Sequence, residues 1–255
     1  MARAISRVSA KITSKPTFVG TDGNSLHNGI LLALPRRESD AVFSTLELVE
    51  LRSHDVLNEM GEPIEYFYFM NSGLASILNV TGDGKSVEVG LTGKEGVVGL
   101  PLVVGLKTSA SRIVVQIPGS AFRLSAANLL RVLGKCSHLE KLLNRYSHEL
   151  TMQAMQVAAC NRLHEVPERL ARWLLMSQDR IGGDKVPLTQ EFLAHMLGTR
   201  RASVTVGAGI LHKAGLINYT RGSVTVVNRR SLEDAACECY QTITRQSQRW
   251  RSESS

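Results

Sequence analysis

Two adjacent arginines, Arg200 and Arg201, stand in the first turn of a short predicted helix. Cations are electrostatically unfavourable at the N-terminal end of a helix dipole, so the pair favours a functional explanation. A helix that presents its first turns to DNA would use both groups. Ala202 and Thr205 lie on or beside the face of Arg201, where base-edge contact is expected. The alternative interpretation is an ordinary helical hairpin packed in a core.

The segment Pro187–Leu216 must position these residues, and its pattern predicts two short helices joined by a turn. Thr189 is expected to cap the first helix, and Gly198 permits the positive φ that ends it. Thr199 is expected to cap the second helix, over residues 199–214. The apolar face of the first helix is predicted to consist of Phe192, Leu193, Met196 and Leu197.

Two β-rich runs follow this helix pair, Ile217–Tyr219 and Val224–Val227, separated by a turn that contains Gly222. They predict a hairpin, and a helix pair followed by a hairpin is a winged helix-turn-helix. Arg221 is expected at the tip of the wing, near phosphate. Thr189 and Gln190 are the other predicted phosphate contacts.

Four cysteines offer a second kind of chemistry. Cys160 and His164 are one helical turn apart, and Cys237 and Cys239 form a C-x-C pair, so metal binding or redox chemistry is conceivable. A last helix is expected over 231–240, and on it Cys237 and Cys239 would point to different faces. Buried apolar thiols are therefore favoured, and no metal site is predicted.

Catalysis has no comparable signal. The sequence shows no nucleophile–base arrangement, phosphate-loop motif or metal triad, so no catalytic residue is assigned and no enzyme is expected. Glu88, His138 and His148 are isolated, and a solvated surface position is expected for each.

The net charge of +7 is unevenly distributed. Residues 1–20 hold four basic side chains and no acid, and residues 165–255 hold 13 basic against 9 acidic ones. The basic surplus of the last third suits a polyanion partner. With no run of about 20 apolar residues and no secretory signal, a cytoplasmic protein without membrane contact is expected.

Along the chain, a disordered basic leader is expected over 1–25, with short helices over Asn28–Leu34 and Arg36–Glu50. A β-rich domain over 26–136 follows, and Asp83-Gly84 is a hairpin signal within it. Residues 165–240 form the predicted DNA-binding domain, and 241–255 a frayed polar tail. The predicted strands include Ile64–Met70, Leu74–Val80, Ser86–Leu91 and Arg112–Ile117.

One long helix is predicted over 137–164, because neither Pro nor Gly interrupts this segment. Apolar residues recur along it at alternating steps of four and three, which is typical of a coiled-coil seam. The alternative is a helix packed on its own domain. An inter-subunit disulfide through Cys160 is conceivable under oxidation. The predicted seam comprises Leu139, Leu143, Tyr146, Leu150, Gln153, Val157 and Cys160.

These features together resemble the CRP/FNR family, the regulators related to the cyclic AMP receptor protein. The resemblance rests on the Gly198–Arg201 turn, the Ser203-Val204 pair, the Leu216-Ile217 entry to the wing, and the Asn71–Gly73 turn upstream. It extends from about Leu31 to Tyr240. It implies an α+β chain with an N-terminal cyclic-nucleotide-binding-like β-roll, a long dimerisation helix and a C-terminal winged helix-turn-helix.

The nucleotide site of the family is not preserved. Where the family has Gly-Glu, this chain has Gly99-Leu100, and Leu100 cannot accept a ribose hydrogen bond. The family's Arg-Ser is reversed as Ser111-Arg112, and Met155 stands at a base-contacting position of the long helix. Cyclic AMP is therefore not expected as effector. The effector-pocket candidates for another small molecule, if one binds, are Gly99, Leu100, Ser111, Arg112 and Met155.

The resemblance implies a homodimeric transcription regulator that binds a near-palindromic site in double-stranded DNA and contacts RNA polymerase. Arg201 corresponds to the family's first base-contacting arginine, which suits guanine. Ala202 and Val206 replace a Glu and a second Arg, so a different half-site is expected. No cofactor is predicted, because the FNR branch uses N-terminal cysteines and none precedes Cys136. The alternative is a small-molecule or redox sensor whose DNA binding is weak or effector-dependent.

Overall fold

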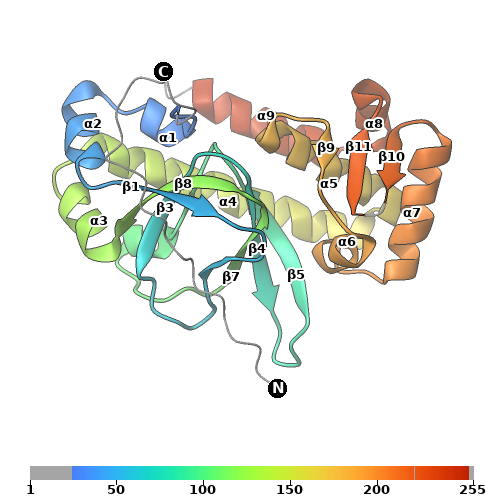
Figure 1. The fold of residues 1–255 in the computed structure, drawn as a ribbon, viewed down its shortest axis with the longest axis horizontal. Helices are drawn as coiled ribbons and strands as arrows, with labels where there is room; N and C mark the ends of the chain where they lie inside the picture. Colours follow the sequence, from blue (N-terminus) through green and yellow to red (C-terminus); the bar gives the residue numbers. More distant parts are fainter. Residues whose placement is uncertain (1–24, 221, 253–255) are drawn as a thin grey trace. The chain divides into compact units, whose positions relative to one another are not determined.

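The computed structural model of the chain describes residues 25–220 and 222–252 (Figure 1). The chain forms two compact units. The first comprises the chain up to Ile77 together with Thr92–Ser147, and the second comprises Leu78–Leu91 together with His148–Ser255. The basic leader falls almost wholly outside the described residues.

Two short helices precede the first sheet. Helix α1 (Gly29–Leu32) begins at Asn28, whose side chain accepts a hydrogen bond from the Leu31 amide at 3.0 Å. Helix α2 (Arg36–Phe43) is shorter than the predicted helix over Arg36–Glu50. It ends at Phe43, and strand β1 (Glu47–Leu51) begins four residues later. Val49 and Leu51 are both buried, which is the period of two that a strand produces, so this part of the predicted helix is a strand.

The chain is β-rich where short β runs with turn signals predicted strands, and these strands form two four-stranded sheets. The predicted strand over Leu74–Val80 is present, and so is the one over Arg112–Ile117. The predicted hairpin turn lies between Leu74–Val80 and the strand Ser86–Thr92, and it follows the expected chemistry, since Gly84 has a φ of 81°. The first sheet has the antiparallel order β1-β8 (Gly119–Ser125)-β3 (Tyr66–Met70)-β6 (Val97–Val98), and the second β2 (Val56–Asn58)-β7 (Arg112–Ile117)-β4 (Leu74–Val80)-β5 (Ser86–Thr92).

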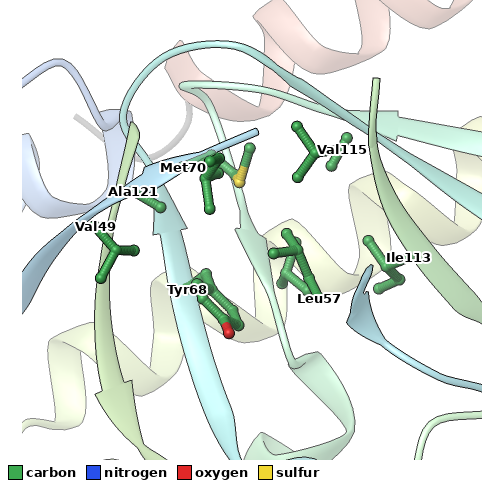
Figure 2. Close-up of a cluster of buried hydrophobic side chains, with 10 residues drawn as sticks. Val49, Leu57, Tyr68, Met70, Ile113, Val115 and Ala121 are labelled. Carbon is green, nitrogen blue, oxygen red and sulfur yellow. The ribbon is translucent and has the colours of Figure 1, made fainter. Parts of the chain in front are cut away.

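A hydrophobic cluster lies between the strands of the first unit (Figure 2). Met70 and Val115 are fully buried, and Tyr68 is almost so, which raises the pKa of its phenol to about 12 through desolvation. Two other elements of this unit were not predicted from the sequence, the short 3-10 helix η1 (Leu100–Val104) and helix α3 (Ala126–Leu133).

The predicted long helix is present as α4 (Ser137–Leu163). Its first turn receives negative charge, because the carboxylate of Glu38 accepts hydrogen bonds from the amides of His138 and Leu139 at 3.0 and 2.9 Å. An anion at this end of a helix is stabilising.

The rest of the second unit contains a helix pair, a small sheet and two C-terminal helices. Helix α5 (Val166–Ile181) starts with a capping box formed by Glu165 and Glu168. The other elements are β9 (Lys185–Val186), α6 (Gln190–Met196), α7 (Arg201–Lys213), β10 (Ile217–Thr220), β11 (Ser223–Val226), α8 (Arg229–Ala235) and α9 (Cys239–Ser252).

Two expectations about the C-terminus were wrong. The predicted single helix over 231–240 is interrupted, since α8 ends at Ala235 and the backbone of Ala236 is extended. The segment expected to be a frayed tail continues α9 to Ser252. The break therefore places Cys237 in the link between α8 and α9, and Cys239 at the first position of α9.

Glu88 on β5 is also not where it was expected. Its side chain is buried instead of solvated, and its Oε1 accepts a hydrogen bond from the indole Nε1 of Trp173 at 2.7 Å. Trp173 lies in the middle of α5, where every residue from Arg169 to Gln178 is buried.

Candidate nucleic-acid interface

The predicted helix-turn-helix is formed by α6 and α7. Thr189 caps α6, because its hydroxyl accepts a hydrogen bond from the Phe192 amide at 3.2 Å. Gly198 in the turn has a φ of 56°, and a Cβ there would lie 2.8 Å from Cγ2 of Val87. Both the backbone conformation and the close approach therefore require glycine at this position.

Helix α7 begins later than predicted. Its N-cap is Arg200 instead of Thr199, and no side chain caps it in the described part of the chain. The first turn contains no acidic residue, while Arg200 and Arg201 are both exposed there. The positive end of the helix dipole and two cations thus face solvent together, an arrangement that attracts an anion.

The outward face of α7 combines the predicted base-contacting residues. Arg201, Ala202 and Thr205 are exposed, and the Thr205 hydroxyl donates to the Arg201 carbonyl at 3.0 Å. Val206 and Ile210 continue this face at 64% and 51% exposure. The opposite face, which packs into the unit, consists of Val204, Gly207, Ala208 and Leu211.

The predicted wing is present as the antiparallel pair β10–β11, in which Tyr219 lies opposite Val224. A third strand that the sequence analysis missed, β9, pairs with the other edge of β11. The Leu188 amide donates to the Gly222 carbonyl at 2.9 Å, which connects the start of the helix pair to the wing turn. Arg221 and the side chain of Gln190 lie outside the described residues.

The effector-pocket candidates do not all belong to one unit. Gly99, Leu100, Ser111 and Arg112 belong to the first unit, whereas Met155 belongs to the second and is 60% exposed. Arg112 Nη2 lies 3.0 Å from Glu59 Oε2, so an acid of the chain itself pairs with the guanidinium. The two residues that follow Gly99 begin η1, and Pro101 has no N–H to offer an anion.

The predicted coiled-coil seam requires a correction, because it faces the chain's own fold. All its residues except Leu150 are buried within the single chain. The Tyr146 hydroxyl donates to Thr92 Oγ1 at 2.6 Å, and Gln153 Nε2 donates to the Leu91 carbonyl at 3.1 Å. These residues therefore fit the alternative interpretation, in which the long helix packs on its own domain.

The sulfur residues form a group that the sequence analysis did not expect. Sγ of Cys160 lies 3.4 Å from Sγ of Cys237, and Sγ of Cys239 lies 3.6 Å from Nδ1 of His164. The hydrogen bond from Cys237 and the charge of Arg172 lower the pKa of Cys160 to about 5, while the same bond and burial raise the pKa of Cys237. Cys160 is buried beside thiols of its own chain, so it does not face a second subunit there.

Two arginines beside the sulfur residues were also missed. Arg172 and Arg169 on α5 are 2% and 7% exposed. Arg169 Nη2 donates to Asn161 Oδ1 at 3.0 Å and also to the Leu197 carbonyl, in the turn between α6 and α7. Two arginines on the apolar face of α5, three residues apart, were the available sequence signal, since buried arginines require anions or acceptors.

Comparison with known proteins identifies both domains. A model of the cyclic nucleotide-binding domain matches residues 48–136, and a model of the Crp-like helix-turn-helix domain matches residues 168–235. The structure of FixK2 from Bradyrhizobium japonicum is 18% identical, with a TM-score of 0.64 over 75% of this chain and 98% of its own.

Two further structures share the fold. CLP, the c-di-GMP-responsive global regulator of Xanthomonas campestris, is 15% identical, with a TM-score of 0.61 over 75% of this chain and 99% of its own. TTHB099, a transcriptional regulator of the CRP family from Thermus thermophilus, is 17% identical, with a TM-score of 0.61 over 73% and 95%.

A cyclic nucleotide-binding domain followed by a long helix and a Crp-like helix-turn-helix is the organisation of a DNA-binding transcription regulator. The chain belongs to the CRP/FNR family, whose members are regulators and not enzymes. No helix in the described part of the chain is both long and apolar enough to span a membrane.

Proposed function

We propose that the protein is a homodimeric, sequence-specific DNA-binding regulator whose effector, if it has one, is not cyclic AMP. The observation that carries this proposal is the exposed first turn of α7, where Arg200 and Arg201 stand without an acidic neighbour in that turn. In a helix-turn-helix protein the N-terminal residues of the second helix contact base edges in the major groove.

The exposed residues in the first half of α7 each suit a particular contact. Arg201 carries a bidentate donor pair that matches O6 and N7 of guanine. Ala202 and Val206 offer only apolar surface, which suits the methyl group of thymine. Thr205 can hydrogen-bond to a base. Arg200, the N-cap residue of α7, is the other proposed base contact. Phosphate contacts come from Thr189, Gln190 and Arg221, which flank the helix in sequence.

The dimer interface is assigned to the exposed face of α4 in place of the buried seam. Met155 and Leu163 are 60% and 73% exposed, and Ala159 between them is also exposed. Together with half-buried Met152, these residues recur at steps of three and four, so they form an apolar stripe open to a second helix. Such a dimer would present two recognition helices to half-sites about 34–36 Å apart.

The nucleotide domain supports the negative statement about cyclic AMP. The Arg112 guanidinium is already paired with Glu59, and Leu100 supplies no acceptor for a ribose hydroxyl. Cyclic AMP would have to displace the carboxylate and would leave its ribose hydroxyl unmatched. Another small-molecule effector and RNA polymerase remain as proposed partners.

The test is selection of the purified full-length protein against fragmented genomic DNA, without added ligand, followed by fluorescence anisotropy on the selected sites. We expect a near-palindromic site that differs from that of the cyclic AMP receptor protein, with affinity that falls steeply as salt rises. Weak, sequence-independent binding would contradict the proposal that the protein binds its DNA site specifically without a ligand. A calorimetric titration that shows tight cyclic AMP binding would overturn the statement about the effector.

A further inference from the structure

Four potential metal ligands converge in the second unit. Cys160 and His164 come from the last turn of α4 and the residue that follows it. Cys237 lies in the link between α8 and α9, and Cys239 is the first residue of α9. Segments more than seventy residues apart in sequence thus bring three thiols and one imidazole to a single point.

The distances match a single tetrahedral ion. The four ligand atoms all lie within 4.8 Å of one another, with 3.4 Å between the sulfurs of Cys160 and Cys237 and 3.6 Å from the Cys239 sulfur to the His164 nitrogen. Around Zn²⁺, bonds of about 2.3 Å to sulfur and 2.0 Å to nitrogen at tetrahedral angles place two sulfurs about 3.8 Å apart, and a sulfur and a nitrogen about 3.6 Å apart.

We propose that Cys160, His164, Cys237 and Cys239 form a Cys₃His site that binds one zinc-class divalent metal ion. Three soft thiolates exclude Mg²⁺ and Ca²⁺, which prefer oxygen ligands. An iron–sulfur cubane attaches each protein ligand to a different iron and so requires wider spacing. The three cysteines are 0, 4 and 1% exposed, and four protein ligands leave no open position, so the site is structural and not catalytic.

The surroundings of the four residues have the organisation of a metal site. His164 presents Nδ1 to the sulfurs, while its Nε2 lies 3.0 Å from a carboxylate oxygen of Glu238. A carboxylate behind a ligating histidine fixes the orientation and tautomer of the ring. Gln156 Nε2 lies 3.0 Å from Sγ of Cys239, where an amide N–H donates to a thiolate.

The charges of the neighbouring arginines also suit a site that contains a bound metal ion. Three thiolates, a neutral imidazole and one divalent ion carry a net charge of −1. The guanidinium groups of Arg169 and Arg172 are both buried, and their Nε atoms have no hydrogen-bond partner among the described residues. An anionic metal centre compensates this buried positive charge.

The position of the site indicates what the ion would hold. It would join the end of α4 to the α8–α9 link, and Arg169 connects Asn161, the neighbour of Cys160, to the Leu197 carbonyl before α7. Metal binding would therefore stabilise the unit that carries the recognition helix. This last step rests on the proposed DNA-binding function, whereas metal binding itself does not.

The first experiment measures metal in the full chain, purified anaerobically without chelators. Elemental analysis should find about one zinc per chain in the wild type, as a Cys₃His site requires. The same content is expected in Cys136→Ala, because Cys136 is a buried residue of the first unit and does not belong to the group of four ligands. Cys160→Ala, Cys237→Ala and Cys239→Ala should each lose most of the metal. Equal metal content in all four variants would overturn the proposal.

The second experiment needs no variant and is independent of DNA binding. Wild-type protein is stripped of metal under reducing conditions and titrated with Co²⁺, which takes the place of Zn²⁺. Intense visible bands of tetrahedral cobalt with thiolate charge transfer, saturating at an equimolar ratio, are expected, together with a higher Tm. A spectrum of hexaaqua cobalt would overturn the proposal. So would iron and inorganic sulfide in the purified protein, or a Cys160–Cys237 disulfide that survives anaerobic purification.

Discussion

The indole Nε1 of Trp173 donates a hydrogen bond to Oε1 of Glu88 at 2.7 Å, although the two residues are 85 positions apart in sequence. Trp173 is fully buried and Glu88 is 4% exposed, so water competes little for either group. Glu88 is thereby a fixed partner of the helix that supports α7, and its carboxylate has a structural role.

Replacement of Glu88 by leucine should destabilise this unit. Glu88→Leu removes the acceptor and leaves a buried indole N–H unsatisfied, which costs about 1–3 kcal/mol. Glu88→Gln is the matched control, because its amide oxygen can still accept, and less than half of that loss is expected. Urea unfolding followed by circular dichroism measures both. Equal losses in the two variants would contradict the assigned hydrogen bond.

The two glycines inside α7 should respond differently to replacement by alanine. A Cβ at Gly209 meets no atom within 4 Å, so Gly209→Ala should raise the free energy of unfolding by up to about 1 kcal/mol. A Cβ at Gly207 would lie 3.4 Å from both Pro167 N and Val166 Cγ1, so Gly207→Ala should gain less or lose stability. Denaturant midpoints compare the pair, and a Gly207 variant at least as stable as the Gly209 variant would refute the packing argument.

Local signals were sufficient to predict the helix-turn-helix and its wing. Gly198 marks the turn, the buried Val204, Ala208 and Leu211 recur at helical spacing, and β10 and β11 flank a glycine turn. Each of these patterns depends on neighbours within a few residues. The same is true of the β4–β5 hairpin, where Gly84 has the positive φ that the turn requires.

Residues whose role depends on distant partners were not predicted. The seam on α4 has the correct helical period, but a period does not say whether Tyr146 meets Thr92 of its own chain or a second helix. The break after Ala235 has no glycine or proline to mark it, so Cys237 and Cys239 were placed on one helix. The proximity of Cys237 and Cys239 to Cys160 could not be predicted from the sequence, because it depends on that break and on tertiary packing.

Tyr240 on α9 should give the unit a distinct alkaline pH dependence. Burial, followed by the negative charge of Asp179, raises the pKa of Tyr240 to about 12. The folded state therefore holds the phenolic proton more tightly than the unfolded state, whose pKa is 10.0. Its contribution is fully present below pH 10 and is lost between pH 10 and about 12, with a slope of at most about 1.4 kcal/mol per pH unit.

Tyr240→Phe isolates this effect, because other titrating groups, including Tyr68, are common to both proteins. At neutral pH the variant should lose roughly 1 kcal/mol, since the phenol accepts from Arg229 at 2.7 Å and donates to Asp179 at 3.0 Å. Between pH 10 and 11 the wild type should lose stability faster than the variant. Parallel stability curves over that range would disprove the role of Tyr240.

Arg201 should determine one base pair of the DNA site. On the site recovered by selection, Arg201→Ala should weaken binding by about 1–3 kcal/mol and remove discrimination at a single position of each half-site. The reason is that Arg201 is exposed in the first turn of α7, where a bidentate contact with guanine is geometrically available. Anisotropy with the selected site and its single-base variants measures both quantities.

Lys213→Ala is the matched control, because Lys213 is also an exposed cation but lies in the last turn of α7. If the N-terminal end of the helix enters the groove, loss of Lys213 should change affinity by no more than about twofold, the scale of one peripheral charge. The pattern of affinity losses across DNA sequences shows whether Arg201 contacts a base or a phosphate. If Arg201→Ala weakens all sequences equally and lowers the salt slope by about one, Arg201 contacts phosphate and the base assignment fails.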